Sequence, residues 1–206
     1  MYQIGLTGSI ATGKSTVLKL LIQLGATCID GDEIAREAVR PGSSGLRKIT
    51  KAFGIAILHS NGSLNREKLG ELVFKDPVSK ALLEKIIHPA IQNRLKQKLA
   101  AFKKRKINIV VLDIPLLYEV EYQNQVDEVW VVYVNEALQL TRLMKRNGYT
   151  ETEALARIRS QYPIEKKKTL ANVVIDNSGS LACTEHQLKV AWQATLKKFA
   201  LQEDTL

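Results

Sequence analysis

The chain opens with an apolar segment, Tyr2 to Leu6, followed by the octet Gly8-Ser9-Ile10-Ala11-Thr12-Gly13-Lys14-Ser15. Two outer glycines followed by lysine and a hydroxyl residue form the spacing of a phosphate-binding loop, or P-loop. Backbone N–H groups of such a loop converge on phosphates at the positive end of the next helix. Lys14 is expected to reach the β- and γ-phosphates and the Ser15 hydroxyl to bind Mg²⁺. The octet therefore predicts a site for a nucleoside triphosphate.

Short apolar segments rich in valine and isoleucine predict five strands. They are Tyr2 to Leu6, Ala26 to Ile29, Ile107 to Leu112, Glu128 to Val134, and Val173 to Ile175. Their nearly continuous apolar character is typical of parallel strands that are buried on both faces. Helical patterns separate the strands, so the sequence predicts an α/β fold: a P-loop core with a five-stranded parallel sheet flanked by helices.

Two stretches are too long to be single crossover helices, and we expect both to be helical excursions within one domain of residues 1–206. The first, about 33–106, contains helical pieces near 65–74 and 77–106, the latter with Pro89 as a point of bending. The second, about 138–170, is charged and interrupted near Gly148 and Pro163. We interpret them as a substrate subdomain and a lid. The core then comprises about 1–32, 107–137 and 171–206.

The composition is that of a globular protein, with 45% hydrophobic and 25% charged residues among 206. No stretch approaches the roughly 18 consecutive apolar residues of a membrane helix, so no membrane partner is expected. Two cysteines are too few for a disulfide framework, and no signal peptide is evident, which favours the cytoplasm. The net charge of +9 favours anionic partners such as nucleotides, nucleic acids or phosphorylated metabolites.

The length favours a small kinase or a small GTPase over a large motor ATPase. The chain lacks the Asn-Lys-x-Asp guanine motif. The excursion after the fourth strand carries arginines, which suit a kinase lid because they can neutralise charge on the transferred phosphoryl group. A small P-loop kinase is therefore the favoured class.

Further segments carry a family resemblance. In chain order they are Ile29-Asp30-Gly31-Asp32 with Ala35-Arg36, Leu64-Asn65-Arg66 before Val73-Phe74, His88-Pro89, Pro115-Leu116-Leu117-Tyr118-Glu119, Arg142, Arg146, Gln161, and Val174-Ile175-Asp176-Asn177-Ser178-Gly179. Together with residues 4–16 they resemble the dephospho-coenzyme A kinases over almost the whole chain. The resemblance implies that ATP, with Mg²⁺, phosphorylates the ribose 3′-hydroxyl of dephospho-CoA, the last step of coenzyme A synthesis. It also implies a helical CoA domain and a lid beside the P-loop core.

The residue types and the resemblance together assign site roles. The expected catalytic residues are Asp32, Lys14 and Arg142. ATP is expected to contact Gly8, Ala11, Thr12, Gly13, Lys14, Ser15, Thr16, Arg142, Arg146, Asn177 and Gly179. Dephospho-CoA is expected to contact Asp32, Arg66, His88 and Leu117, and Mg²⁺ to contact Ser15 and Asp113.

Plainer interpretations of several of these residues stay open. Asp32 matches the family's proposed base, but it could also cap a helix starting at Glu33. Asp113 ends the third predicted strand and could hold Mg²⁺ directly, hold it through water, or be a structural residue. The two arginines share one helix face, which could simply be solvated. A lone histidine before proline, such as His88, is often structural.

A few positions depart from the family pattern or carry no chemistry. Ser9 stands where a second glycine is usual, and Thr12 where serine is common. Asn172 stands where an aspartate usually precedes the last strand, so no charge-dependent role is assigned to it. Cys28 is expected to pack in a strand, and Cys183 has no suggestive partner.

Two other functions are compatible with the sequence. One is another small P-loop kinase, acting on a nucleoside monophosphate or a small metabolite. The other, of a different class, is a nucleotide-dependent RNA-binding protein, which the net charge permits. Aromatic residues make up only 6% of the chain and form no RNA-reading motif, so nucleic acid is the disfavoured partner. The sequence predicts nothing about the oligomeric state.

Overall fold

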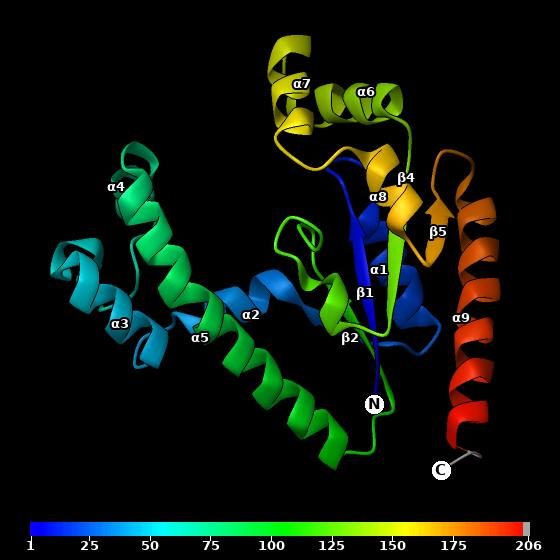
Figure 1. Ribbon diagram of the computed structural model, residues 1–206. Helices are drawn as coiled ribbons and strands as arrows, with labels where there is room; N and C mark the ends of the chain where they lie inside the picture. Colours follow the sequence, from blue (N-terminus) through cyan, green and yellow to red (C-terminus); the bar gives the residue numbers. More distant parts are fainter. Residues whose placement is uncertain (204–206) are drawn as a thin grey trace. The chain divides into compact units, whose positions relative to one another are not determined.

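The structure, a computed structural model, describes residues 1–203. Its centre is a five-stranded parallel sheet with the strand order β2-β3-β1-β4-β5 (Figure 1). The strands are β1 (Tyr2–Gly8), β2 (Thr27–Asp30), β3 (Ile109–Asp113), β4 (Glu128–Tyr133) and β5 (Val173–Asp176). The predicted parallel α/β sheet is confirmed, and every strand begins and ends within two residues of its expected position.

The strand order places the site. In open parallel sheets, ligands bind beyond the carboxyl ends of the strands, where the strand order reverses. Here the chain leaves the central strand β1 toward β2 and β3 on one side and later fills β4 and β5 on the other. The loop after β1 therefore lies at the reversal point.

The chain divides into two compact units, and each is described by itself. The first comprises Met1–Asp30 and the chain from Ile107 onward, and the second comprises Gly31–Lys106. The helices of the first unit are α1 (Lys14–Gln23), α6 (Glu136–Asn147), α7 (Glu151–Arg159), α8 (Ile164–Leu170) and α9 (Leu181–Glu203), with a 3₁₀ turn at Tyr122–Gln125.

Apolar side chains cover both faces of the sheet. On one face α1 and α9 pack against the strands around Trp130, which is fully buried. On the other face, Leu117 and Ile164 pack against alternate residues of β4, such as Val131. Because β4 is covered on both sides, all six of its residues are buried. This accounts for its nearly continuous apolar sequence.

Helix α1 has a glycine at each boundary. Gly13 occupies the N-cap position with φ +87°, a left-handed conformation that favours glycine, and it has no side chain with which to cap the helix. At the other end, Gly25 has φ +88°, and its N–H donates to the Ile22 carbonyl. The next N–H, of Ala26, donates to the Leu21 carbonyl, which completes a Schellman motif.

A polar network ties α9 to the amino end of β4. The Glu128 carboxylate is buried and accepts hydrogen bonds from Lys198 Nζ at 2.7 Å, Trp130 Nε1 at 3.1 Å and Thr195 Oγ1 at 3.2 Å. Burial alone would raise its pKa, but the bonds from Lys198 and Trp130 outweigh burial and hold the pKa of Glu128 below its ordinary value. This network lies at the opposite end of β4 from the loop that follows the strand.

Helices α6 and α7 form a small cluster of their own with the P-loop. Leu143, Ala154 and Ile158 are buried between them, and Ile10 and Ala11 pack against this cluster. The tip of the loop is therefore held by apolar contact with the segment that follows β4. Within the part of the chain that the structure describes, no helix is long and apolar enough to cross a membrane.

The second unit is helical. Its elements are α2 (Gly31–Ala38), α3 (Ser44–Phe53), a 3₁₀ turn at Ile55–Ile57, α4 (Arg66–Lys75) and α5 (Pro77–Lys104). Side-chain oxygens of Ser43, Asn65 and Asp76 cap α3, α4 and α5. The helix α5 continues through Pro89, where a bend was expected.

One boundary in this unit differs from the expectation. The sequence suggested a helix starting at Glu33 with Asp32 as a possible cap, but α2 begins two residues earlier, at Gly31. Asp32 therefore lies inside the first turn, where its charge favours the positive end of the helix without filling the cap position. Farther along, Glu37 Oε2 accepts from Arg94 Nε at 2.5 Å, which joins α2 to α5.

Candidate active site

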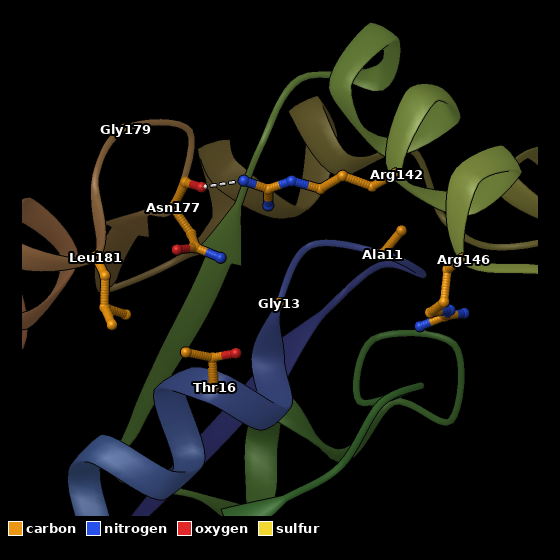
Figure 2. A pocket seen from close by; sticks show the side chains of 8 residues that line it. All are labelled: Ala11, Gly13, Thr16, Arg142, Arg146, Asn177, Gly179 and Leu181. Carbon is orange, nitrogen blue, oxygen red and sulfur yellow. Dashed lines mark hydrogen bonds between the residues drawn. The ribbon is translucent and has the colours of Figure 1, made fainter.

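A pocket of about 390 Å³ lies where the P-loop, α6 and the loop after β5 meet (Figure 2). Its lining residues are Ala11, Gly13, Thr16, Arg142, Arg146, Asn177, Gly179 and Leu181. Seven of these eight were expected from the sequence to contact ATP. Each lining segment follows the carboxyl end of a strand, which is why positions more than 160 residues apart meet here. The volume falls in the ordinary range for small-molecule sites, about 300–1,000 Å³.

The P-loop turns tightly because its residues bond to one another. Thr12 is buried, and both its N–H and its hydroxyl donate to the Ser9 carbonyl, at 3.2 Å and 2.9 Å. A Cβ at Gly8 would lie 2.7 Å from Thr12 Oγ1 and 2.9 Å from the Val132 carbonyl oxygen, so this position excludes side chains. Ala11 adopts a left-handed conformation with φ +63°. Gly8 and Thr12 thus shape the loop, although they do not line the pocket.

Asn177 holds the loop from the opposite side. Its side-chain amide donates to the Thr12 carbonyl at 2.8 Å, and its side-chain oxygen accepts from Thr184 Oγ1 at 3.0 Å. Its backbone carbonyl accepts from Arg142 Nη2 at 2.9 Å, as Figure 2 shows. A Cβ at Gly13 would overlap the Asn177 amide nitrogen. One buried asparagine therefore joins the P-loop, α6 and the start of α9.

The two arginines of α6 are used differently. Arg142 is half-buried and crosses the pocket to the Asn177 carbonyl. Arg146, one turn later, is exposed, and its Nε donates to Asn147 Oδ1 at 2.8 Å. Both line the pocket, so it carries two permanent positive charges. This arrangement suits an anionic ligand.

Lys14 forms an ion pair with Asp113 at the end of β3. Asp113 is only 7% exposed, so the ammonium offsets the cost of burying this carboxylate. Asp30 lies beside Asp113 in the register of β2 and β3. Burial, with a smaller contribution from Asp113, raises the pKa of the nearby Cys28 thiol to about 11. Cys28 therefore stays protonated at neutral pH, as a packing residue should.

The residues expected to bind Mg²⁺ supply the oxygen donors that this ion prefers. The Ser15 hydroxyl lies on the exposed first turn of α1, and the Asp113 carboxylate lies at the end of β3. Among residues 1–203, no group of three or more His, Cys, Asp or Glu residues gathers as a metal site. One hydroxyl and one carboxylate fit an ion that takes most of its other ligands from substrate phosphates and water.

Three of the expected site residues lie in the second unit. Asp32 is exposed in the first turn of α2, Arg66 is the exposed first residue of α4, and His88 is exposed on α5, just before Pro89. Within this unit the three occupy three different helices. Their roles stay predictions.

Leu117 was expected to contact dephospho-CoA, and that role stays a prediction. Its side chain is fully buried in the cluster beneath β4, where a Cβ at Gly5 would overlap it. In this conformation the side chain packs and offers no surface to a substrate. Leu181, in contrast, was missed: it is 56% exposed, begins α9 and lines the pocket. The only signal for it was its position just after the loop that follows β5.

A family model for dephospho-CoA kinase matches residues 2–182. The chain belongs to the dephospho-CoA kinase family. A dephospho-CoA kinase from Carboxydothermus hydrogenoformans is 46% identical over 200 residues, which cover 95% of this chain and 97% of that one. One from Geobacillus kaustophilus is 47% identical over 185 residues, covering 90% and 92%. A solved dephospho-CoA kinase from Campylobacter jejuni superposes with a TM-score of 0.73 at 31% identity, covering 95% and 98%. The similarity spans both units of the dephospho-CoA kinase fold.

Proposed function

We propose that this kinase transfers the γ-phosphoryl group of ATP to the ribose 3′-hydroxyl of dephospho-CoA, giving CoA and ADP. One observation on this chain's own residues supports the proposal. The P-loop, two arginines and the loop after β5 converge on a single pocket in a member of the dephospho-CoA kinase family. The same convergence favours a small anionic ligand over a nucleic acid, because the two arginines and the P-loop line one pocket of small-molecule size.

The P-loop and the arginines would supply the positioning and the positive charge. In phosphoryl transfer most of the catalysis comes from these two effects, with little covalent chemistry by the protein. Lys14 would leave Asp113 to contact the transferred phosphoryl group, and Arg142 would leave the Asn177 carbonyl for the same charge. Ser15 and Asp113 would hold Mg²⁺, which when bound would supply positive charge to offset the charge that develops on the phosphates. Backbone groups of Asn177 and Gly179 would contact the purine.

Asp32 would accept the proton of the 3′-hydroxyl. The reaction needs a group that orients this hydroxyl and takes its proton. Asp32 is exposed and follows β2 by two residues along the chain, and open parallel sheets bind their ligands beyond the carboxyl ends of the strands. Arg66 and His88 would bind dephospho-CoA, which makes residues 31–106 the substrate subdomain and 138–170 the lid. The cytoplasm is the proposed compartment.

A coupled assay for ADP release tests the proposed substrate. The purified protein is incubated with ATP and Mg²⁺ and, separately, with dephospho-CoA, AMP, CMP or shikimate. We expect rapid turnover with dephospho-CoA alone and no turnover when EDTA replaces Mg²⁺. Faster turnover with another acceptor would show that this is a small kinase with a different substrate.

A pair of matched variants tests the proposed base. Asp32→Asn keeps the size of the side chain, and loss of one charge in the first turn of α2 costs about 0.3–1 kcal/mol of stability. Loss of a general base lowers turnover by about 10²–10⁴-fold. Asp30→Asn is the control, because the same chemical change two residues earlier should cost less activity. Normal turnover in Asp32→Asn together with an inactive Asp30→Asn would assign the base to Asp30.

A further inference from the structure

The short segment between α7 and α8 lies against the back of the P-loop. Gln161 Oε1 accepts the Ile10 N–H at 2.8 Å, and Ser9 Oγ donates to the Tyr162 carbonyl at 3.4 Å. The second of these bonds uses the serine that replaces the family's usual glycine. Two consecutive residues of the segment thus contact two consecutive residues of the loop, although about 150 residues of chain separate them.

Buried charges anchor this segment. Glu119 Oε1 accepts the Tyr162 N–H at 2.9 Å and pairs with Lys167 Nζ at 2.7 Å. Lys167 is fully buried in α8, and Glu119 is half-buried in the turn that follows β3. Removal of Glu119 would leave the buried Lys167 ammonium without its partner, which is strongly destabilising, so the pair holds the segment in place. Gln161 therefore reaches the loop from a segment that Glu119 and Lys167 hold in place.

The Ile10 N–H has a particular need for this acceptor. Ile10 packs against the apolar cluster of α6 and α7, where a peptide N–H without a partner is costly. The next residue, Ala11, holds a left-handed conformation that is unfavourable for alanine. The loop would relax from this shape unless its neighbours fixed it.

We propose that Gln161 is a positioning residue of the P-loop: it holds the Ile10 N–H so that the loop keeps its phosphate-binding shape before ATP arrives. The residue acts through the loop and touches no substrate. A loop already in this shape loses less freedom when ATP binds, which increases affinity. The inference rests on the proposed function only for the identity of the nucleotide.

Two variants of equal length separate the hydrogen bond from simple packing. Gln161→Met removes the strong acceptor, whereas Gln161→Glu keeps it. In the nucleotide-free protein, NMR-detected hydrogen exchange of the Ile10 amide should be at least about tenfold faster in Gln161→Met and close to wild type in Gln161→Glu. The Kd of ATP should rise about three- to tenfold in Gln161→Met, and the Kd of dephospho-CoA should not change. Because Gln161→Glu also adds a negative charge, we compare only its Ile10 amide exchange with that of Gln161→Met, and not its affinity for ATP.

Gln193→Met, at an exposed position of α9, is the control and should change neither quantity. Unchanged Ile10 exchange in Gln161→Met would overturn the proposal, and so would equally fast exchange in Gln161→Glu. Faster exchange with an unchanged Kd for ATP would also overturn it, because the loop would then not need to be held in advance. Wild-type turnover with dephospho-CoA tests the proposed function separately, since the exchange measurement uses no substrate.

Discussion

Replacement of Gly13 by alanine tests how tightly the loop and Asn177 fit together. The left-handed conformation at this position costs alanine about 1–2 kcal/mol relative to glycine. The added Cβ would also overlap the Asn177 amide nitrogen, which donates to the Thr12 carbonyl. Moving Asn177 would leave a buried polar group without its partner, at about 1–3 kcal/mol, and overpacking adds a similar amount. We expect Gly13→Ala to lose about 3–8 kcal/mol of unfolding free energy.

Gly25 provides the matched control for the backbone cost. Its φ of +88° nearly equals the +87° of Gly13, but a Cβ there would meet nothing within 4 Å. Gly25→Ala should therefore lose only about 1–2 kcal/mol. Urea unfolding, followed by the fluorescence of Trp130 and Trp192 in the core of the first unit, measures both variants.

Equal losses in the two variants would refute the reasoning, because Asn177 would then move aside at no cost. A double-mutant cycle gives the same answer independently. In an Asn177→Ala background the overlap is gone, so adding Gly13→Ala should cost no more than Gly25→Ala does. If Gly13→Ala instead cost as much in the Asn177→Ala background as in the wild type, about 3–8 kcal/mol, the cost would not come from the overlap with Asn177.

Lys14→Ala should lower turnover by orders of magnitude, and normal turnover would reject the P-loop assignment. Differential scanning calorimetry should show a lower Tm without nucleotide, because Asp113 loses its ammonium partner. Glu128 has a lowered pKa, so its stabilisation is present above its unfolded value of about 4.3 and is lost as the pH falls through the folded value. Glu128→Gln should thus flatten the acid limb of a Tm–pH curve, and an unchanged limb would contradict the argument. Leu117→Ala should lose about 2–5 kcal/mol in urea unfolding; a smaller loss together with a higher Kd for dephospho-CoA would instead favour a substrate contact.

The parts of the fold predicted from the sequence are those with local signals. The octet at Gly8 fixes a strand, a loop and a helix in order, and the continuous apolar residues of β4 require cover on both faces. The start of α2 was misplaced because Gly31 is a poor helix former, yet the helix begins at this residue. Helix boundaries of this kind depend on neighbours that a short sequence window does not contain.

In the site, too, the residues with local sequence signals were predicted and those without were not. Ala11, Gly13 and Arg142 were predicted because motif or spacing marks them, and the structure brings them to one pocket. The side-chain bonds of Asn177 were not predicted, because its partners Thr12 and Thr184 become neighbours only when the sheet is assembled. Leu117 is a different case, because the sequence marked this residue but its side chain is buried. A motif position can be kept for packing, and the sequence alone does not separate that from contact with a ligand.

Helix α1 begins without a side-chain cap, and this links the stability of the folded protein to its ligand. Gly13 has no side chain to accept the first N–H groups, and the first turn, Lys14 to Thr16, contains no acidic residue. A bound phosphate would satisfy those groups, so part of the stability of the folded chain would then come from the bound nucleotide. A ligand at a hundred times its Kd adds about 2.7 kcal/mol to the unfolding free energy. Degradation by proteases that act on opened chains would then accelerate when ATP is scarce. The amount of this kinase in a starved cell would decline with the supply of its own co-substrate.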